Sequence, residues 1–217
     1  SINSTLAKNE MHDGVHVRIM VTRGIKKTPS QDPRLTISGP NVVIIAEYKK
    51  ASNDTKAKGI TLFTSSFRRG SPDYLDPKLN CHSKLHEVQA LIQAIEAGAD
   101  EALMLDINGF VSTCNATNFF IVKDNEVWTS TGAYCMNGIT RQKVIEICAK
   151  NNIPCHQKNF SLYDAYSADE AFVTGTFGGL TPVMHIDGKP IDNQNGASLR
   201  ADLDHLYEEL IANESKS

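Results

Sequence analysis

The sequence lacks the cysteine and histidine patterns that mark disulfide-rich and metal-binding proteins. It has five cysteines among 217 residues, and none of them is in a CxxC spacing. An odd number of cysteines without that spacing argues against a disulfide framework and indicates reduced thiols. The seven histidines form no HExxH motif and stand near no cysteine pair, so we expect no metal site.

Strong charge of one sign and long apolar runs are also missing. The 22 basic and 25 acidic residues give a net charge of −3, and no basic stripe with interleaved aromatics suggests nucleic-acid binding. No apolar run approaches the roughly 20 residues of a membrane-spanning helix, and the first residues are unlike a signal peptide. We therefore expect a cytoplasmic protein with neither nucleic acid nor membrane as a partner.

What is present is a mixed pattern of strands and helices. The 41% hydrophobic content can form one good core or two small ones. Short β-rich runs separated by Asp, Asn and Gly predict an antiparallel meander over 103–105, 119–122 and 127–129. Further strands are predicted at 15–22, at 41–47 as a buried strand, and at 59–66, whereas 1–13 is expected to fray.

Amphipathic periodicity predicts three helices, at 84–97, 141–150 and 196–212. In the first of them, five apolar side chains share one face, which is expected to meet the core; they are Leu85, Val88, Leu91, Ile92 and Ile95. Proline and glycine concentrate between Phe67 and Pro77, so we place a domain boundary near Ser71. This gives a small domain with its linker over 1–71 and a larger domain over 72–217.

Two glycine-threonine turns are candidate phosphate sites. Gly138, Ile139 and Thr140 precede the helix at 141–150, with Thr140 as its expected N-cap, and a helix start presents unpaired N–H groups to an anion. Ordinary capping is the alternative. A second turn, Gly175-Thr176, ends a β-run and can aim further N–H groups at the same anion.

Together with the stretch from Gly109 to Phe120 that precedes them, these turns resemble the class IV aminotransferases, the fold-type IV enzymes that use pyridoxal phosphate. The resemblance is close over 65–193 and looser before it. It implies an α/β (α+β) fold of two domains with antiparallel-rich sheets, a homodimer, and an amino donor and a keto acid as substrates. In the family, several strands, a helix and a phosphate-binding arginine precede the equivalent of Val15, so we expect an incomplete small domain here.

The resemblance also assigns roles to single residues. The residues expected to bind the cofactor are Thr113, Gly138, Ile139, Thr140, Gly175 and Thr176. Counting from Asp76-Pro77, the lysine that binds the cofactor covalently in the family falls on Asn80, whose amide nitrogen is not nucleophilic. Lys84, four residues later, is the nearby amine that could take its place, and a solvent-facing lysine is the alternative.

A second departure concerns the carboxylate that keeps the cofactor's pyridine nitrogen protonated in the family. Thr113 stands in that position and offers only a neutral hydrogen bond. Three interpretations follow: a class IV aminotransferase of weak or altered activity on amino acids or amines, a non-catalytic protein that binds pyridoxal phosphate or another phosphorylated ligand, and an aminodeoxychorismate-lyase-like eliminase. Candidates for binding a substrate carboxylate, each with surface solvation as its alternative, are Arg23, Arg68, Arg69 and Arg141.

Overall fold

The structure, a computed structural model, describes residues 2–49, 53–191 and 198–215. The chain forms two compact units, Ser1–Ala51 and Ser52–Ser217. No helix in these described ranges is long and apolar enough to cross a membrane. The expected start of the last helix at Gly196 lies outside the described residues.

The first unit is a two-stranded antiparallel ribbon with a short helix. Its elements are α1 (Ile2–Lys8), β1 (Val15–Val21), η1 (Pro33–Leu35) and β2 (Val42–Tyr48). The strands pair from Val15 opposite Tyr48 to Val21 opposite Val42. Both strands were predicted, but β2 is not the buried strand we expected, because its apolar residues remain largely exposed on a ribbon of two strands. The expectation that 1–13 frays was also wrong for 2–8, which is helical.

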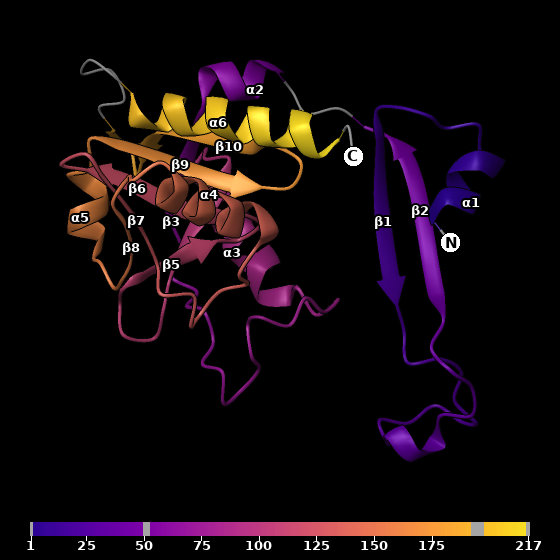
Figure 1. The fold of residues 1–217 in the computed structure, drawn as a ribbon. Coiled ribbons are helices and arrows are strands. Elements are labelled where there is room, and N and C mark those ends of the chain that lie inside the picture. The colour runs from indigo at the N-terminus through magenta and orange to yellow at the C-terminus, as the bar shows by residue number, and fades with distance from the viewer. Residues whose placement is uncertain (1, 50–52, 192–197, 216–217) are drawn as a thin grey trace. The chain divides into compact units, whose positions relative to one another are not determined.

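The second unit is built on a nine-stranded mixed sheet (Figure 1). Its strands are β3 (Ile60–Thr64), β4 (Glu101–Leu105), β5 (Val111–Cys114), β6 (Asn118–Lys123), β7 (Glu126–Thr129), β8 (Cys155–Gln157), β9 (Glu170–Gly175), β10 (Gly179–Ile186) and β11 (Lys189–Pro190). They lie in the order β5-β4-β3-β10-β9-β6-β7-β8, and β11 pairs with β10. Strand β3 is parallel to both of its neighbours and β7 is parallel to β8, while the other pairs are antiparallel.

The predicted meander is correct only in part. β6 and β7 form an antiparallel hairpin, as expected. β4, however, pairs with β3 and β5, and the second neighbour of β6 is β9. Long-range pairing therefore separates β4 from β6, which the local turn signals could not show.

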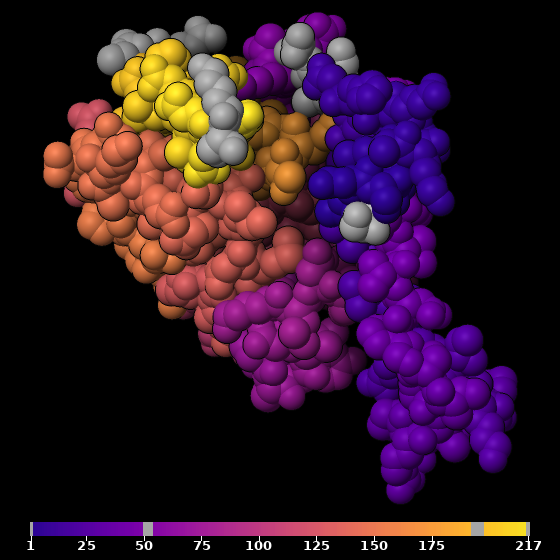
Figure 2. Space-filling model, turned by 45° about the vertical axis from the view of Figure 1, so that its right-hand side comes forward, coloured from indigo at the N-terminus to yellow at the C-terminus, as the bar shows by residue number. Residues whose placement is uncertain are grey.

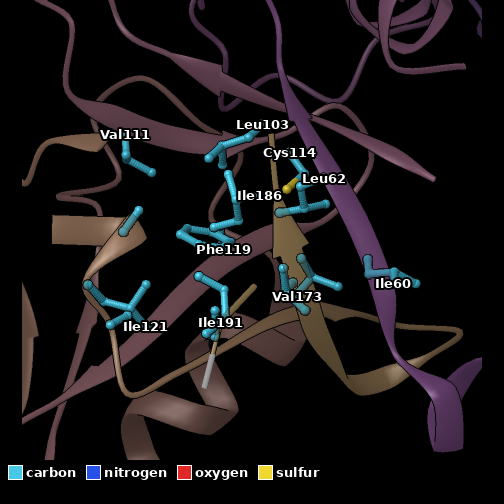
Figure 3. Packing of buried hydrophobic residues seen from close by; sticks show 14 of the residues in the cluster. Ile60, Leu62, Leu103, Val111, Cys114, Phe119, Ile121, Val173, Ile186 and Ile191 are labelled. Carbon is cyan, nitrogen blue, oxygen red and sulfur yellow. The ribbon is translucent and has the colours of Figure 1, made fainter. Parts of the chain in front are cut away.

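Alternation along the strands divides the core between the two faces of the sheet. Phe119 and Ile121 point into the first cluster (Figure 3), whereas Phe120 and Val122 point into the second. Helices α4 (Ile139–Lys150) and α6 (Leu199–Glu214) cover the second cluster, and α6 is the yellow helix of the space-filling view (Figure 2). The Phe120 ring stacks on the Phe172 ring at 5.0 Å between centroids.

Helix α3 (Leu85–Glu96) presents an unexpected face to the sheet. Its buried residues are Glu87, Ala90 and Ala94, and the two alanines pack with Ala102 and Met104 of β4. Of the predicted apolar face, Leu91 is only half-buried and four residues are exposed: Leu85 (72%), Val88 (48%), Ile92 (48%) and Ile95 (62%). That face was wrongly assigned to the core, because the small alanine face allows the closer approach to β4.

The division into units differs from the boundary expected near Ser71. It lies between Ala51 and Ser52, because β3 is hydrogen-bonded between β4 and β10 inside the second unit. The remaining helices of that unit are α2 (Asn53–Lys58) and α5 (Leu162–Tyr166). The proline- and glycine-rich segment 67–77 is therefore a loop of the second unit.

Candidate functional site

The side chain of Asn118, the first residue of β6, connects this strand to two segments that were predicted to contact the cofactor, the loop before α4 and the strand β5. Its Oδ1 accepts a hydrogen bond from Gly138 N at 3.3 Å. Its Nδ2 donates to Met136 O at 2.9 Å and to Thr113 Oγ1 at 3.3 Å. Asn118 is buried, so this amide fixes the loop before α4 against β5 and β6.

The second glycine-threonine turn follows the end of β9 that lies beside Asn118. Asn118 lies directly opposite Thr174 in the β6–β9 ladder. A Cβ atom on Gly175 would stand 3.4 Å from Thr117 Cγ2. Residues directly opposite each other in an antiparallel pair share a face, so Thr174 lies on the face where Asn118 holds Gly138.

Helix α4 begins with its first-turn N–H groups uncapped by any side chain. Its N-cap is Gly138, with φ −64° and ψ 151°, and not Thr140 as predicted. Thr140 is buried in the first turn with its Oγ1 3.4 Å from Tyr207 Oη, while Ile139 is 76% exposed. A helix start of this kind binds anions through its N–H groups and its dipole.

Two hydroxyl groups near this helix start differ in their surroundings. Thr174 Oγ1 is buried and has no hydrogen-bond partner among the described residues. A buried polar atom without a partner costs about 1–3 kcal/mol, which a bound polar ligand would offset. Thr176, in the turn itself, is exposed.

Thr113 is buried and already occupied by protein groups. Its hydroxyl donates to Thr117 O at 2.7 Å and accepts from Asn118. The neighbouring carboxyl group, that of Glu101, accepts from Thr117 Oγ1 at 2.7 Å. Burial is the main cause that raises the pKa of Glu101, and this hydrogen bond opposes it.

The raised pKa of Glu101 makes stability depend on pH. The folded state holds this proton more tightly than the unfolded chain, so the free energy of unfolding falls as pH rises from the unfolded pKa, about 4.3, through the folded pKa. We expect Glu101→Gln to remove that loss. In urea unfolding, the free energy of unfolding of the variant should therefore rise relative to that of the wild type between about pH 4.5 and about pH 7.5. Glu96→Gln, at an exposed position, is the control, and an equal gain there would contradict the assignment.

A pocket of about 460 Å³ lies beside the start of α3 and is lined by residues from 68 to 89. Arg69, which is 4% exposed, forms its buried wall. Arg69 Nη1 donates to Glu87 Oε1 at 2.9 Å and to His86 Nε2 at 3.2 Å. Because Nε2 accepts, the His86 imidazole is neutral; accordingly its pKa is lowered, chiefly by burial and further by the charges of Arg69 and Lys84, against the opposing charge of Glu87.

The two predicted lysine-slot candidates lie at this pocket in different ways. Asn80 is exposed and outside the lining, although its neighbours Leu79 and Cys81 both line the pocket. Lys84 lines it, with Nζ 3.9 Å from Glu87 Oε1. The exposed side chain of Lys84 is thus paired with an acid.

The pocket and the cradle formed by the two glycine-threonine turns share one loop, residues 130–138. Tyr134 O accepts from Arg69 Nε at 3.2 Å on the pocket side. The same oxygen accepts from Ser112 Oγ at 3.0 Å, next to Thr113. This carbonyl therefore ties the wall of the pocket to the strand that carries Thr113.

Surface solvation, the alternative for all four arginines, is wrong for two of them. Arg69 and Arg141 are 4% and 2% exposed, whereas Arg23 and Arg68 are more accessible to solvent. Arg141 Nη2 donates to Ser130 O at 2.7 Å and to Gln157 Oε1 at 3.0 Å. Its guanidinium supports the loop beneath the cradle.

Asn118 and Glu87 are the residues that sequence reasoning missed. A polar residue that opens the apolar run Asn118-Phe119-Phe120 was the available signal for the first. Glu87, one of the two acids of α3, gave no comparable signal. No group of three or more His, Cys, Asp or Glu in the described part of the chain is arranged to hold a metal ion.

Comparisons with known proteins match the chain to one family. The family described as Amino-transferase class IV matches residues 1–186. "Branched-chain-amino-acid aminotransferase-like protein 2" of Arabidopsis thaliana is 39% identical over 97% of this chain and 37% of its own length. A "Putative branched-chain-amino-acid aminotransferase" of Methanocaldococcus jannaschii is 35% identical over 95% of this chain and 70% of its own.

A solved structure shows the same fold. The branched-chain amino acid aminotransferase of T.th., complexed with N-(5'-phosphopyridoxyl)-L-glutamate, superposes with a TM-score of 0.87 at 27% identity, covering 98% of this chain and 69% of that one. The chain spans less than two fifths of the length of the two Arabidopsis relatives, 37% and 38%. With its family match, its relatives and its mixed fold in agreement, the chain belongs to the class IV aminotransferase family.

Proposed function

We propose that this chain binds pyridoxal phosphate and is an aminotransferase of class IV, acting on amino acids or amines with weak or altered activity. The observation that carries the proposal is the position of Asn118: its side chain bonds to Gly138 and Thr113, and its backbone lies opposite Thr174, the residue before the second glycine-threonine turn. Structures of the T.th. relative with pyridoxamine 5'-phosphate and with a phosphopyridoxyl adduct support the choice of ligand.

The residues present fit the phosphate end of that cofactor. The uncapped start of α4 supplies N–H groups from Ile139 and Thr140, and the dipole of α4 favours a dianion there. The buried Thr174 Oγ1, which has no partner among the described residues, lies on the same face. In this proposal Gly138, Gly175 and Thr176 shape the two turns around the phosphate.

The bound cofactor supplies an aldehyde and an electron-withdrawing ring for reactions at the α-carbon of amines. Thr113 offers its end of the site only a neutral hydroxyl, which is already donated to Thr117 O. Asn80 supplies no nucleophile in the lysine slot, and Lys84 Nζ is near Glu87. The chain therefore has groups that can bind the cofactor phosphate but lacks an evident amine for proton transfer, and for this reason we propose weak or altered activity.

A second candidate is a protein that binds pyridoxal phosphate without catalysis. The pairing of Lys84 with Glu87 favours it, because Lys84 is the lysine that lines the pocket. In both candidates the phosphate is held by the same residues. They differ in whether an amine of this chain reacts with the cofactor.

Gly138→Ala tests the cradle. A Cβ at this position would stand 2.7 Å from Asn118 Oδ1, so the Asn118 amide must shift and release the loop. We expect the affinity for pyridoxal phosphate, measured by absorption titration, to fall at least about tenfold, or about 1.4 kcal/mol. Gly39→Ala is the matched control, because nothing lies within 4 Å of its added Cβ. Equal binding by wild type and Gly138→Ala would overturn the cradle, and no binding by either would overturn the cofactor.

We also propose that the chain forms a homodimer, with α3 at the contact between copies. Four exposed apolar side chains follow each other at spacings of three and four along this helix: Leu85, Val88, Ile92 and Ile95. This is the seam by which helices pair through a narrow apolar stripe. A cytoplasmic location likewise remains a prediction.

Val88→Asp combined with Ile95→Asp tests this contact. Two carboxylates in the seam would have to be desolvated on pairing, so we expect sedimentation at about half the wild-type mass. Glu96→Lys on the same helix serves as the control and should leave the mass unchanged. A wild type that sediments as a monomer at every concentration would contradict the proposal.

A further inference from the structure

Two cysteines outside the proposed cofactor site lie where α4 ends and β8 begins. Cys148, in the last turn of α4, is fully buried, and Cys155, the first residue of β8, is partly exposed. Both belong to the packing of the second core cluster. We propose that Cys148 and Cys155 form a dithiol site that closes to a disulfide when a hydroperoxide reaches it.

The chain reversal after α4 brings the two cysteines together. Asn152 has a positive φ of 56°, and Ile153 N donates to Cys148 O at 2.9 Å. This six-to-one bond across a left-handed residue is a Schellman ending, which turns the chain back along the helix it has just left. Pro154 is then the only residue left before Cys155.

A second contact fixes how β8 faces α4. Arg141 and Cys148 are seven residues apart, so they lie on one face of the helix two turns from each other. Cys155 and Gln157 are two apart, so they lie on one face of the strand. Arg141 Nη2 donates to Gln157 Oε1 at 3.0 Å, so this face of α4 packs on this face of β8. Cys148 and Cys155 lie on the same two faces at the other end of the contact, and Cys155 therefore faces Cys148.

The surroundings give the two sulfurs different roles. The hydrogen bond from Cys148, followed by the positive charge of Arg141, lowers the pKa of Cys155 against the opposing effect of burial. The same hydrogen bond, together with burial, raises the pKa of Cys148. Cys155 is therefore the thiolate that reacts first, and it is also the more accessible of the two.

The reaction is a two-electron oxidation of the pair. The Cys155 thiolate attacks one oxygen of hydrogen peroxide, the O–O bond breaks, and Cys155 becomes a sulfenic acid while hydroxide leaves and takes up a proton. Cys148 sulfur then attacks Cys155 sulfur, the S–O bond breaks, and the released hydroxide leaves as water with the proton of Cys148. Two thiols and one peroxide thus give one disulfide and two waters.

The other three cysteines lie in surroundings that do not favour this reaction. Cys114 and Cys135 are buried, and burial raises the pKa of Cys114 well above its ordinary value. Cys81 is partly exposed in the pocket, and its thiol donates to Ser83 O at 3.9 Å. The reaction should therefore select the pair on α4 and β8.

The test is peptide mapping of the full folded chain after brief treatment with hydrogen peroxide and alkylation of the remaining thiols. We expect one linked peptide pair, Cys148 with Cys155, lighter by two hydrogens and restored by dithiothreitol. Cys148→Ala should stop at a sulfenic acid on Cys155 that dimedone captures, whereas Cys81→Ser should form the disulfide as the wild type does.

Three results would overturn the proposal. In the first, Cys155 remains a thiol and is alkylated while Cys81 is oxidised. In the second, Cys148 or Cys155 forms a disulfide with any other cysteine. In the third, Cys155 is oxidised to the sulfinic acid without forming a disulfide. The wild-type map alone distinguishes these results, so the test does not depend on whether Cys148→Ala folds. It requires no bound cofactor and is independent of the proposed function.

Discussion

We expect Asn80→Lys to gain a covalent, borohydride-reducible link to pyridoxal phosphate that the natural chain does not form at position 80. A primary amine is the nucleophile that an aldehyde cofactor requires, and an amide nitrogen cannot replace it. Asn80 is exposed between two residues that line the pocket, Leu79 and Cys81. Intact mass after reduction, followed by peptide mapping, measures the gain. Transamination should rise by about 10²-fold or more, the range in which a missing acid-base group acts.

Asn80→Arg is the matched control, since it adds the same charge without a reactive amine. A link at position 80 of Asn80→Lys with new activity, beside an inert wild type, would support the non-catalytic candidate for the natural chain. If the wild type already forms the covalent link to pyridoxal phosphate at Lys84, and Lys84→Arg abolishes that link, the result would instead support an aminotransferase that uses Lys84. If the wild type binds the cofactor but no variant links to it, the assignment of the lysine slot to Asn80 is wrong.

We expect Glu87→Ala to lower the free energy of unfolding by about 3–5 kcal/mol, because it leaves the buried guanidinium of Arg69 without its anion. The two side chains are only 5% and 10% exposed, with Arg69 Nη1 2.9 Å from Glu87 Oε1. Urea unfolding followed by circular dichroism measures the loss. The pocket wall should loosen with it, because Arg69 also holds Tyr134 O.

The exposed pair Lys143–Glu214 provides the comparison. Its side chains are 31% and 60% exposed, with Lys143 Nζ 3.1 Å from Glu214 Oε1, so Glu214→Ala should lower the free energy of unfolding far less than Glu87→Ala. Removing both partners in Arg69→Met with Glu87→Leu should cost less than Glu87→Ala alone, since no unpaired charge stays buried. A Glu87→Ala loss no larger than that of Glu214→Ala would show that this ion pair is not the support we describe.

Local chemistry in the sequence was sufficient for much of the fold. The β-rich run at 119–122 predicted β6. The short helix α5 begins with a capping box of Ser161 and Asp164, in which Ser161 N donates to Asp164 Oδ2 at 2.9 Å. Gly98 follows Ala97, the last cap residue of α3, and has a φ of +76°, a left-handed conformation that glycine adopts readily and that ends many helices. These features depend on residues that are close in sequence, so they can be predicted without the tertiary structure.

The pairing of the strands and the buried face of α3 could not be predicted in this way. The pairing of β6 with β9 joins residues about fifty positions apart, and no local turn specifies it. The face that α3 turns inward was decided by how closely Ala90 and Ala94 approach Met104, whereas periodicity favoured the larger apolar side chains. Both outcomes depend on which surfaces are available elsewhere in the chain.

For the site, the sequence by itself determined the family, the two glycine-threonine turns, and the presence of Asn80 and Thr113 at positions where the resemblance implies a lysine and a glutamate. Only the tertiary structure decided that Asn118 bonds to Gly138 of the first turn and lies opposite Thr174 beside the second, that Glu87 pairs with Arg69, and that Gly138 rather than Thr140 caps α4. The physical reason is that residue type fixes which chemistry a position can perform. Which groups meet, and which charges lose their water, is set by contacts between segments distant in sequence.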